Sequence, residues 1–537
     1  MFRLTSCGLT SFRLASAIAM AATSFTPPAL AQEETDQRLG TVHFATSCNE
    51  TAQRRFDRGM RYQHSFWYAQ AKEIFEDVLK ADPSCAIAYW GVALSLLSNP
   101  HSAPTPASQP EGLAALQKGK ALAAKTERER EFIDSLLVLY TDFDKVPRGP
   151  RVQAYLKAVE ALAQHYPDDD EAQLNYAITL NVAASPADKT YANQLKGAAI
   201  LERIFTRQPR HPGVAHYLIH LYDTPALADR GLDAAKRYSQ IAPAAPHAQH
   251  MPSHIFTRVG YWKDSISSNT ASVKAAQASK EATDQLHGQD YMVYAYLQLA
   301  QDKRALEVID SMLKSTGYGA AAQGAFFAVA ASPARYMVER ADWNGAAGLE
   351  VRPSNFAHVI ALTHFARALG AARSGKPDAA KADIAKLAEL RDKLREAKDV
   401  YWAEQVDIQW QVTTAWLLYA DGKRDAALKA MSDAADAEDK TEKAPVTPGP
   451  LVPARELYGA MLLDSGMAPE ALAAFEATLK KEPHRFGATI GAARAALKAG
   501  DAAKARANYA AILKLAAEAD PVRPEVAEAL ANTVSVR

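Results

Sequence analysis

The chain has 537 residues, too many for one compact hydrophobic core, so its length indicates several domains or an extended array of repeats. Hydrophobic residues make up 48% and charged residues 23%, as in ordinary globular proteins, and the formal net charge at pH 7 is zero. With no basic stripe and no polybasic tract, the composition argues against nucleic acid and against an anionic membrane surface as partners.

Residues 1–31 have the features of a secretory signal peptide. A basic start precedes a short apolar stretch, and an A-x-A-type cleavage site ends at Ala31. We therefore expect cleavage after Ala31 and a mature protein that is periplasmic or secreted. No later run approaches the roughly 20 apolar residues that a membrane-spanning helix needs. Residues 32–47 are polar, and we expect them to form a flexible N-terminus.

Two cysteines, Cys48 and Cys85, remain after this cleavage. An even pair of cysteines in an oxidising compartment predicts a disulfide, with two buried thiols as the alternative. Cys48 precedes the first expected helix and Cys85 begins the next repeat. The bond would therefore hold down the terminal repeat, which lacks a neighbour on one side.

Helical repeats are predicted along the rest of the chain. Residues 48–98 form N-terminal repeats, in which small, aromatic and proline residues recur at the spacing of helix–turn–helix units. The residues at this spacing are Gly59, Tyr62, Ala71, Phe75, Val78 and Pro83. Central helical repeats occupy 99–348 and begin with a Pro/Ser-rich loop; further helical repeats follow at 349–437. A Pro-rich loop at 438–453 precedes the C-terminal repeats and cap at 454–537.

The central repeats contain two HxxxH pairs, His216 with His220 and His250 with His254. Residues four apart lie on one face of a helix, one turn from each other. The second pair follows the first by 34 residues, and a proline precedes each pair by four residues. Equal offsets put both pairs at matched positions on adjacent, roughly parallel helices. We therefore expect four imidazoles to face one groove and to share one site.

This histidine column continues into the next repeat. When that repeat is aligned on its small-residue position, the matching residues are His287 for His247, Asp290 for His250 and Tyr294 for His254. No Ser-His-Asp order, HExxH motif, catalytic cysteine, strand pattern or Gly-rich phosphate loop is evident in the sequence.

The spacings above resemble those of the tetratricopeptide repeat proteins, whose period is 34 residues. The strongest matches are residues 56–90 and 453–515. The resemblance implies an all-α fold of helix–turn–helix repeats stacked into a curved α-solenoid, with ligands on the concave surface. The block HAQHMPSHIF, with the segment 188–196 and the loop EDKTEK…VTPG, also resembles a bacterial group of exported repeat proteins of unknown function.

The histidine column is the main candidate for chemistry. Imidazoles and carboxylates at i, i+4 spacing on facing helices build metal sites in helical bundles, and neutral imidazole suits divalent Zn, Cu, Ni or Fe. The expected metal ligands are His216, His220, His250, His254 and Asp290. Further candidates in the groove are His64, His101, Asp223, His247, His287 and Tyr294. The alternatives are a metal-free polar ligand site and histidines that serve only as structural hydrogen-bond partners.

Weaker candidates lie outside the column. His64 begins an aromatic stretch that could wall the groove or pack in the core, and His101 could reach the concave face or stay solvated in its loop. Glu442 and Lys443 belong to a charge run that could be solvated or could form a lid over the groove.

Three functions are consistent with this sequence. The first is an exported repeat scaffold whose histidine-rich concave site binds a divalent transition metal or a small ligand. The second is a metal-dependent hydrolase or oxidase that uses the same histidines and an open coordination position. The third is a metal-free adaptor that binds a protein or peptide partner. Fold alone does not decide among them, so enzymatic activity stays open.

Overall fold

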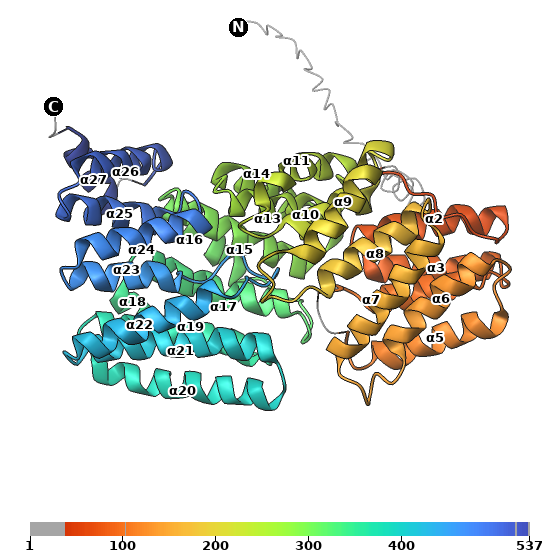
Figure 1. Ribbon diagram of the computed structural model, residues 1–537, viewed down its shortest axis with the longest axis horizontal. Helices are drawn as coiled ribbons and strands as arrows, with labels where there is room; N and C mark the ends of the chain where they lie inside the picture. Colours follow the sequence, from red (N-terminus) through yellow and green to blue (C-terminus); the bar gives the residue numbers. More distant parts are fainter. Residues whose placement is uncertain (1–37, 102–103, 521–522, 535–537) are drawn as a thin grey trace, which may run out of the picture.

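The computed structural model describes residues 38–101, 104–520 and 523–534, and every regular element in these ranges is a helix (Figure 1). The expected signal peptide at 1–31 lies outside the described residues. Consecutive helices pack against one another along the chain, which gives the expected tetratricopeptide-type α-solenoid. None of the described helices combines the length and the apolar character needed to cross a membrane.

The N-terminal part of the solenoid is a stack of helices α2 to α9. Their bounds are α2 (Glu50–His64), α3 (Tyr68–Ala81), α4 (Ile87–Leu96), α5 (Ser108–Leu122), α6 (Glu127–Tyr140), α7 (Arg148–His165), α8 (Asp170–Val182) and α9 (Ala192–Arg207).

The central part contains shorter helices, and its first members carry the HxxxH pairs. The elements are α10 (Pro212–Tyr222), the 3-10 helix η1 (Ala228–Gly231), α11 (Leu232–Ile241), α12 (Pro246–His250), α13 (Pro252–Arg258), α14 (Trp262–Ser279), α15 (Ala282–Gln298), α16 (Asp302–Met312), α17 (Gln323–Glu339) and α18 (Trp343–Ala347).

The C-terminal part returns to long, regular helices. They are α19 (Ala357–Arg373), α20 (Pro377–Glu396), α21 (Val400–Ala420), α22 (Arg424–Asp439), α23 (Ala454–Asp464), α24 (Ala468–Lys481), α25 (Phe486–Lys498), α26 (Ala502–Leu515) and α27 (Pro524–Val534).

The repeat residues identified in the sequence explain how neighbouring helices approach. A Cβ on Gly59 or on Gly91 would lie 2.7 or 2.5 Å from the ring of Phe75, so both glycines make room for that ring between three helices. Near the C-terminus, Gly459 and Gly491 make the same room for Phe475. The two stretches with the strongest repeat pattern therefore share one packing arrangement, which is set by a phenylalanine between two glycines.

The described part of the N-terminal segment, residues 38–47, is packed rather than flexible, which corrects the sequence-based expectation. The Phe44 ring is fully buried, with ring centroids 4.9 Å from Phe56, 5.4 Å from Trp90 and 5.0 Å from Phe132. A fully buried aromatic side chain removes a large apolar area from water, and this burial offsets the entropy lost on ordering the segment.

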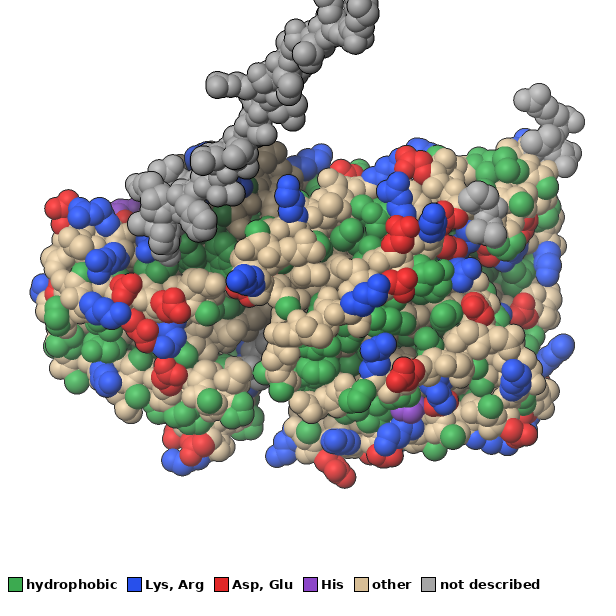
Figure 2. All heavy atoms as spheres, turned by 180° about the vertical axis from the view of Figure 1, so that it is seen from behind, with side chains coloured by type: hydrophobic (Ala, Val, Ile, Leu, Met, Phe, Trp, Pro, Cys, Tyr) green, Lys and Arg blue, Asp and Glu red, His purple; other side chains and the backbone are tan. Residues whose placement is uncertain are grey.

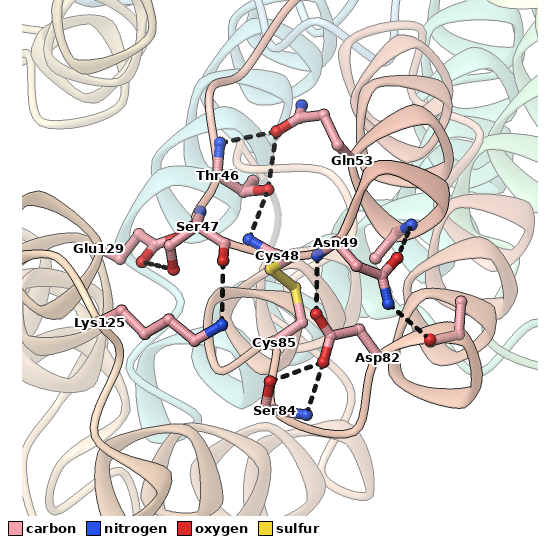
Figure 3. The surroundings of a disulfide bond; sticks show 12 residues. Thr46, Ser47, Cys48, Asn49, Gln53, Asp82, Ser84, Cys85, Lys125 and Glu129 are labelled. Atoms are coloured by element: carbon pink, nitrogen blue, oxygen red, sulfur yellow. Dashed lines mark hydrogen bonds between the residues drawn. A yellow bond between two sulfur atoms is a disulfide. The ribbon is translucent and has the colours of Figure 1, made fainter.

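The cysteine pair forms a disulfide next to this segment (Figure 3). Cys48 and Cys85 are bonded, with their Cα atoms 5.0 Å apart and a sequence separation of 37. Asn49 caps the N-terminus of α2 beside the bond, and its backbone N–H donates to the carboxylate of Asp82. On the chain-entropy view, closing a loop of this length stabilises the folded chain by about 3–4 kcal/mol. The terminal repeat is therefore held by a covalent bond and by polar contacts.

The C-terminal repeats fold back onto the centre of the molecule. Arg485, just before α25, donates to Tyr294 on α15, to Glu339 on α17 and to Glu456 on α23. The guanidinium is fully buried, so these contacts belong to the interior of the molecule. Seen from behind, the N-terminal part and the rest of the molecule are separated by a notch along the lower edge (Figure 2).

Candidate metal centre

The two HxxxH pairs are positioned by three short helices. His216 and His220 lie on α10, which Pro212 begins, because proline suits the first turn of a helix. His250 ends α12, and His254 lies on α13, which begins at Pro252. The intervening Met251 keeps a right-handed helical conformation, with φ −52° and ψ −35°, so the i, i+4 relation survives the break at the proline.

Each pair is completed by one further histidine, which gives two groups of three. In the first group, the Nε2 atom of His216 lies 3.1 Å from Nε2 of His220 and 3.1 Å from Nε2 of His247. This group, His216, His220 and His247, is hereafter the α10 group.

The second group combines the other pair with α15. The Nε2 atoms of His250 and His254 lie 2.9 Å apart, and a ring nitrogen of His287 lies within 4.8 Å of both ligand atoms. His287 Nδ1 is buried and has no hydrogen-bond partner in the described part of the chain. This group, His250, His254 and His287, is hereafter the α13 group. The sequence indicated one shared site, and the structure has two neighbouring groups instead.

Contacts to the Nδ1 atoms determine which nitrogen of each ring is free. His216 Nδ1 donates to the carbonyl oxygen of His64 at 2.7 Å. His250 Nδ1 donates to Oδ1 of Asn269 at 2.6 Å, and His254 Nδ1 donates to the carboxylate of Asp223 at 2.8 Å. Oxygens of these kinds only accept, so Nδ1 carries the proton in all three rings. A neutral ring then presents a bare lone pair at Nε2.

This tautomer has a direct consequence in the α13 group. His250 and His254 point two bare Nε2 lone pairs at each other across 2.9 Å, so neither nitrogen can donate a hydrogen bond to the other. Such an arrangement is repulsive unless a cation lies between the nitrogens. A proton does not suit this position, because burial lowers the pKa of both His250 and His254.

Burial keeps the other histidines neutral as well. It lowers the pKa of His216 and of His287 to about 3, and it lowers the pKa of His220 and of His247 well below the usual value. Neutral imidazole is the form that binds metals. At neutral pH the two groups therefore offer metal ligands that need not release a proton first.

Asp223 connects the α13 group to two cations. Besides accepting from His254, its carboxylate accepts from Arg258 at 2.9 Å and from Lys443 at 2.8 Å. These cations hold the pKa of Asp223 well below its usual range against the opposing effect of burial, and burial lowers the pKa of Lys443 to about 8. A charged Asp223 orients the His254 ring, as carboxylates behind metal-bound histidines do.

The loop that the sequence placed at 438–453, whose first two residues end α22 in the structure, covers the α13 group. Lys443 enters from this loop, and the hydroxyl of Tyr291 on α15 donates to the carbonyl oxygens of Pro445 and Thr447. The same hydroxyl lies 3.4 Å from Nε2 of His254. Figure 2 shows few histidines on the face that it displays, in agreement with their burial.

Two of the residues expected at the site have other partners. The carboxylate of Asp290 is held by Arg335 and Ser332, so Asp290 lies outside both histidine groups. Tyr294 accepts from Arg485 and donates to Glu482, in the network that joins the C-terminal repeats. Both residues lie on α15 with His287, but of the three only His287 contributes a ring nitrogen to the α13 group.

His101 and His64 do lie beside the α10 group. The ring of His101 is 4.6 Å from that of His220 between centroids, and burial lowers its pKa to about 4. His64 forms part of a third set, in which its Nε2 and the Nε2 of His211 each lie 3.1 Å from the Glu171 carboxylate. Both histidines lower the pKa of Glu171, although burial alone would raise it. This set is a buried polar network that the backbone oxygen of His64 links to the α10 group.

Sequence reasoning missed Asn269 and Glu171, and it left open whether the aromatic stretch that contains Phe66 walls the groove or packs in the core. Phe66 packs on the α10 group, with ring centroids 4.2 Å from His216 and 4.9 Å from His247. Its position in the aromatic stretch beginning at His64 was the available signal. Asn269 and Glu171 gave no signal, because their roles depend on how α14 and α8 approach the histidine helices.

No protein-family model and no curated protein matches the chain. Solved structures of helical-repeat proteins do match. The human IFIT1 dimer with m7Gppp-AAAA has 11% identity and a TM-score of 0.35, over 80% of this chain and 90% of that chain. The APC/C hetero-tetramer Cut9-Hcn1 has 12% identity and a TM-score of 0.30, over 90% of each chain. Yeast Tom70 has 14% identity and a TM-score of 0.28, over 90% of this chain and 96% of that chain. At this level the similarity concerns helical architecture alone.

Proposed function

We propose that this protein is an exported tetratricopeptide-type scaffold that binds two transition-metal ions, one in the α10 group and one in the α13 group. The observation that carries the proposal is the pair of bare Nε2 lone pairs, on His250 and His254, that face each other across 2.9 Å in a buried site. A metal ion converts this repulsion into two coordinate bonds. The disulfide and the N-terminal leader expected from the sequence support an exported protein.

The spacing of the nitrogens suits a metal ion. Tetrahedral ligands about 2.0–2.1 Å from an ion lie roughly 3.3 Å from each other. Three Nε2 pairs, two in the α10 group and one in the α13 group, are 2.9–3.1 Å apart, so these pairs can share an ion after movements of a few tenths of an ångström. The remaining ligand atoms of each group lie within 4.8 Å of one another, so the third ring of the α13 group, His287, has farther to move. Imidazole ligands select Zn, Cu, Ni or Fe rather than Mg or Ca.

A specific observation also favours a reactive centre over a purely structural one. Each group supplies three histidines, and a tetrahedral ion with three protein ligands keeps one position for an exchangeable ligand. A metal-free adaptor is the weaker alternative, because the loop at 438–453 already contacts Asp223, Tyr291 on α15 and Arg335 on α17, and a peptide bound beside the histidines would have to displace it.

The test is metal content after purification of the mature chain without a polyhistidine tag. Elemental analysis of metal-loaded and dialysed protein should find two ions per chain. His220→Ala and His254→Ala should each lose one ion, because they disrupt different groups, and the double variant should lose both. His165→Ala is the matched control, since His165 is exposed on α7 and lies outside both groups.

Far-UV circular dichroism of each variant separates metal loss from unfolding. His220→Gln and His254→Gln keep a polar side chain of moderate size where alanine proves disruptive. Unchanged metal content in folded variants, or no bound metal in the parent protein, would overturn the proposal.

A further inference from the structure

The two histidine groups form one continuous cluster of rings. Ring centroids are 6.2 Å apart between His220 and His254 and 6.1 Å apart between His247 and His250, across the boundary of the groups. Within the α10 group, His220 and His247 are 6.4 Å apart. Because the groups are no farther from each other than the rings inside one group, two ions bound here are neighbours. A small ligand at the open position of one ion then reaches the other.

The charge of the site restricts the ions that suit it. The six ligands are neutral imidazoles, and each group as defined contains no carboxylate. Asp223 is the carboxylate that contacts the α13 group, and it already faces Arg258 and Lys443. Two divalent ions would add four positive charges to a buried site that offers little compensation, which is costly. Two monovalent ions halve that charge.

Among the metals that imidazole binds well, copper has an accessible monovalent state and lies at the top of the affinity order for divalent ions. Iron sites of the oxygen-activating type use two histidines and a carboxylate, which neither group provides. Zinc stays divalent and would need a bound anion for charge balance. The ligand set and the charge together therefore favour a pair of cuprous ions.

Building on the proposed function, we propose that the two groups hold two cuprous ions and bind dioxygen between them. Each Cu(I) gives one electron to dioxygen, which becomes a bound peroxide as two Cu–O bonds form and the O–O bond order falls from two to one. Both ions become Cu(II). No proton and no further reductant takes part, and release of dioxygen returns both electrons to the copper ions.

The charge balance of this step fits the site. Two Cu(I) ions carry a total charge of +2, and two Cu(II) ions with one peroxide also carry +2. The buried cluster therefore undergoes no change of net charge on binding, so the cost of burying charge stays nearly constant. His216, His250 and His254 are at most 2% exposed, and Phe66 packs on the α10 group. Such an enclosure suits a small, neutral ligand.

The experiment uses the mature chain without a tag, stripped of metal and loaded anaerobically with two equivalents of Cu(I). Admission of dioxygen should produce an intense near-ultraviolet charge-transfer band, uptake of one dioxygen per two copper ions, and no electron paramagnetic resonance signal because the Cu(II) ions are coupled. Removal of dioxygen under vacuum should reverse the band. Zinc-loaded protein should show no change, and His165→Ala should behave as the parent protein.

His254→Ala is the decisive variant, because it keeps the α10 group intact but removes one ligand of the α13 group, so that two copper ions can no longer be held side by side. It should take up one copper ion and give no band with dioxygen. If two copper ions bind but dioxygen produces no band, or produces the resonance signal of isolated Cu(II), this inference is wrong while the proposed metal binding stands. If neither copper nor zinc binds to the parent protein, the proposed function itself fails.

Discussion

Asn269 is a single residue on which the geometry of the α13 group depends. It is fully buried on α14; its Oδ1 accepts from His250, and its Nδ2 donates to the carbonyl oxygen of Ser265. The second bond fixes which end of the amide faces the histidine. Asn269 therefore keeps the proton of His250 on Nδ1 and its lone pair directed at His254.

Replacing Asn269 with leucine, which has a similar size, should weaken binding of the ion in the α13 group by about 10- to 100-fold. Binding in the α10 group should stay unchanged. Asn269→Asp should retain affinity, because a carboxylate also accepts from Nδ1. Competition with a chelator of known affinity measures the affinity of both sites, with Asn508→Leu, at a partly exposed position of α26, as the control. Equal affinities for Asn269→Leu and Asn508→Leu would contradict the role given to this amide.

His358 illustrates a buried histidine without a metal group around it. Its ring stacks on Trp402 at 4.0 Å between centroids, and burial lowers its pKa from 6.5 to about 3. The unfolded chain therefore binds a proton at this residue between pH 6.5 and pH 3, and the folded chain does not. Stability rises with pH wherever the unfolded state binds more protons, so His358 destabilises the fold as the pH falls through this window.

Below pH 6.5, the free energy of unfolding of His358→Gln should fall less steeply with decreasing pH than that of the parent protein. The two slopes should differ by about 1.4 kcal/mol per pH unit at most. Urea unfolding of metal-free protein at several pH values between 4 and 7 measures the slope. His165→Gln is the comparison, because that side chain is half exposed. Parallel stability curves for His358→Gln and the parent protein would rule out the depressed pKa.

The histidine column could be found from the sequence because its spacings are local. The i, i+4 separation and the 34-residue offset follow from helix and repeat geometry, and the structure does bring the two pairs together. The same spacings placed His247 and His287 in the groove, but their roles as third members, the separation into two groups, and the contact of Asn269 could not be derived in this way. They depend on the angles at which α12, α14 and α15 pack.

At the scale of elements, two connectors meet over the histidine groups. Glu442, in the loop at 438–453, accepts from Lys189 at 2.8 Å and from the hydroxyl of Tyr191 at 3.1 Å. Its neighbour Lys443 reaches Asp223 beneath. The sequence left this charge run open as a lid or a solvated loop. The structure shows it bridging from the connector before α9 to the site.

Glu442→Gln should remove the ion pair with Lys189 and speed the loss of bound metal to an excess of chelator, by several-fold. The number of ions per chain should not change, because Glu442 belongs to neither histidine group. Stopped-flow mixing with a coloured chelator measures the rate. Glu404→Gln, at an exposed position of α21, should release metal at the rate of the parent protein. Identical rates for both variants would mean that this bridge does not limit metal exit.

At the scale of the whole molecule, the repeat pattern predicts a solenoid but does not predict how the solenoid closes. Gly59 and Phe75 determine how two adjacent helices pack, and small rotations between repeats then accumulate along the chain. The outcome is that α25 comes to lie against α15, more than 180 residues earlier. Arg485 gives no sign of this contact in the sequence, because its distant partners Tyr294, Glu339 and Glu456 come from three separate stretches.

Arg485 is the residue that should reveal how much this closure contributes to stability. Its guanidinium is fully buried and balances Glu339 and Glu456, each with a contact of 2.6 Å. Arg485→Met keeps much of the side-chain volume but leaves both carboxylates without their cation. Breaking one side of a buried ion network costs about 3–5 kcal/mol. Arg494→Met, which breaks a more exposed pair with Glu528, should cost less than about 1 kcal/mol.

Denaturant unfolding measures both variants, and adding Glu456→Gln to Arg485→Met should recover part of the loss, because one uncompensated charge is removed. Metal content should stay at the parent value in folded Arg485→Met, since both histidine groups lie on α10 to α15. Equal costs for Arg485→Met and Arg494→Met would show that the C-terminal repeats are held by apolar packing alone. Loss of metal from folded Arg485→Met would show instead that closure of the solenoid onto α15 also positions His287.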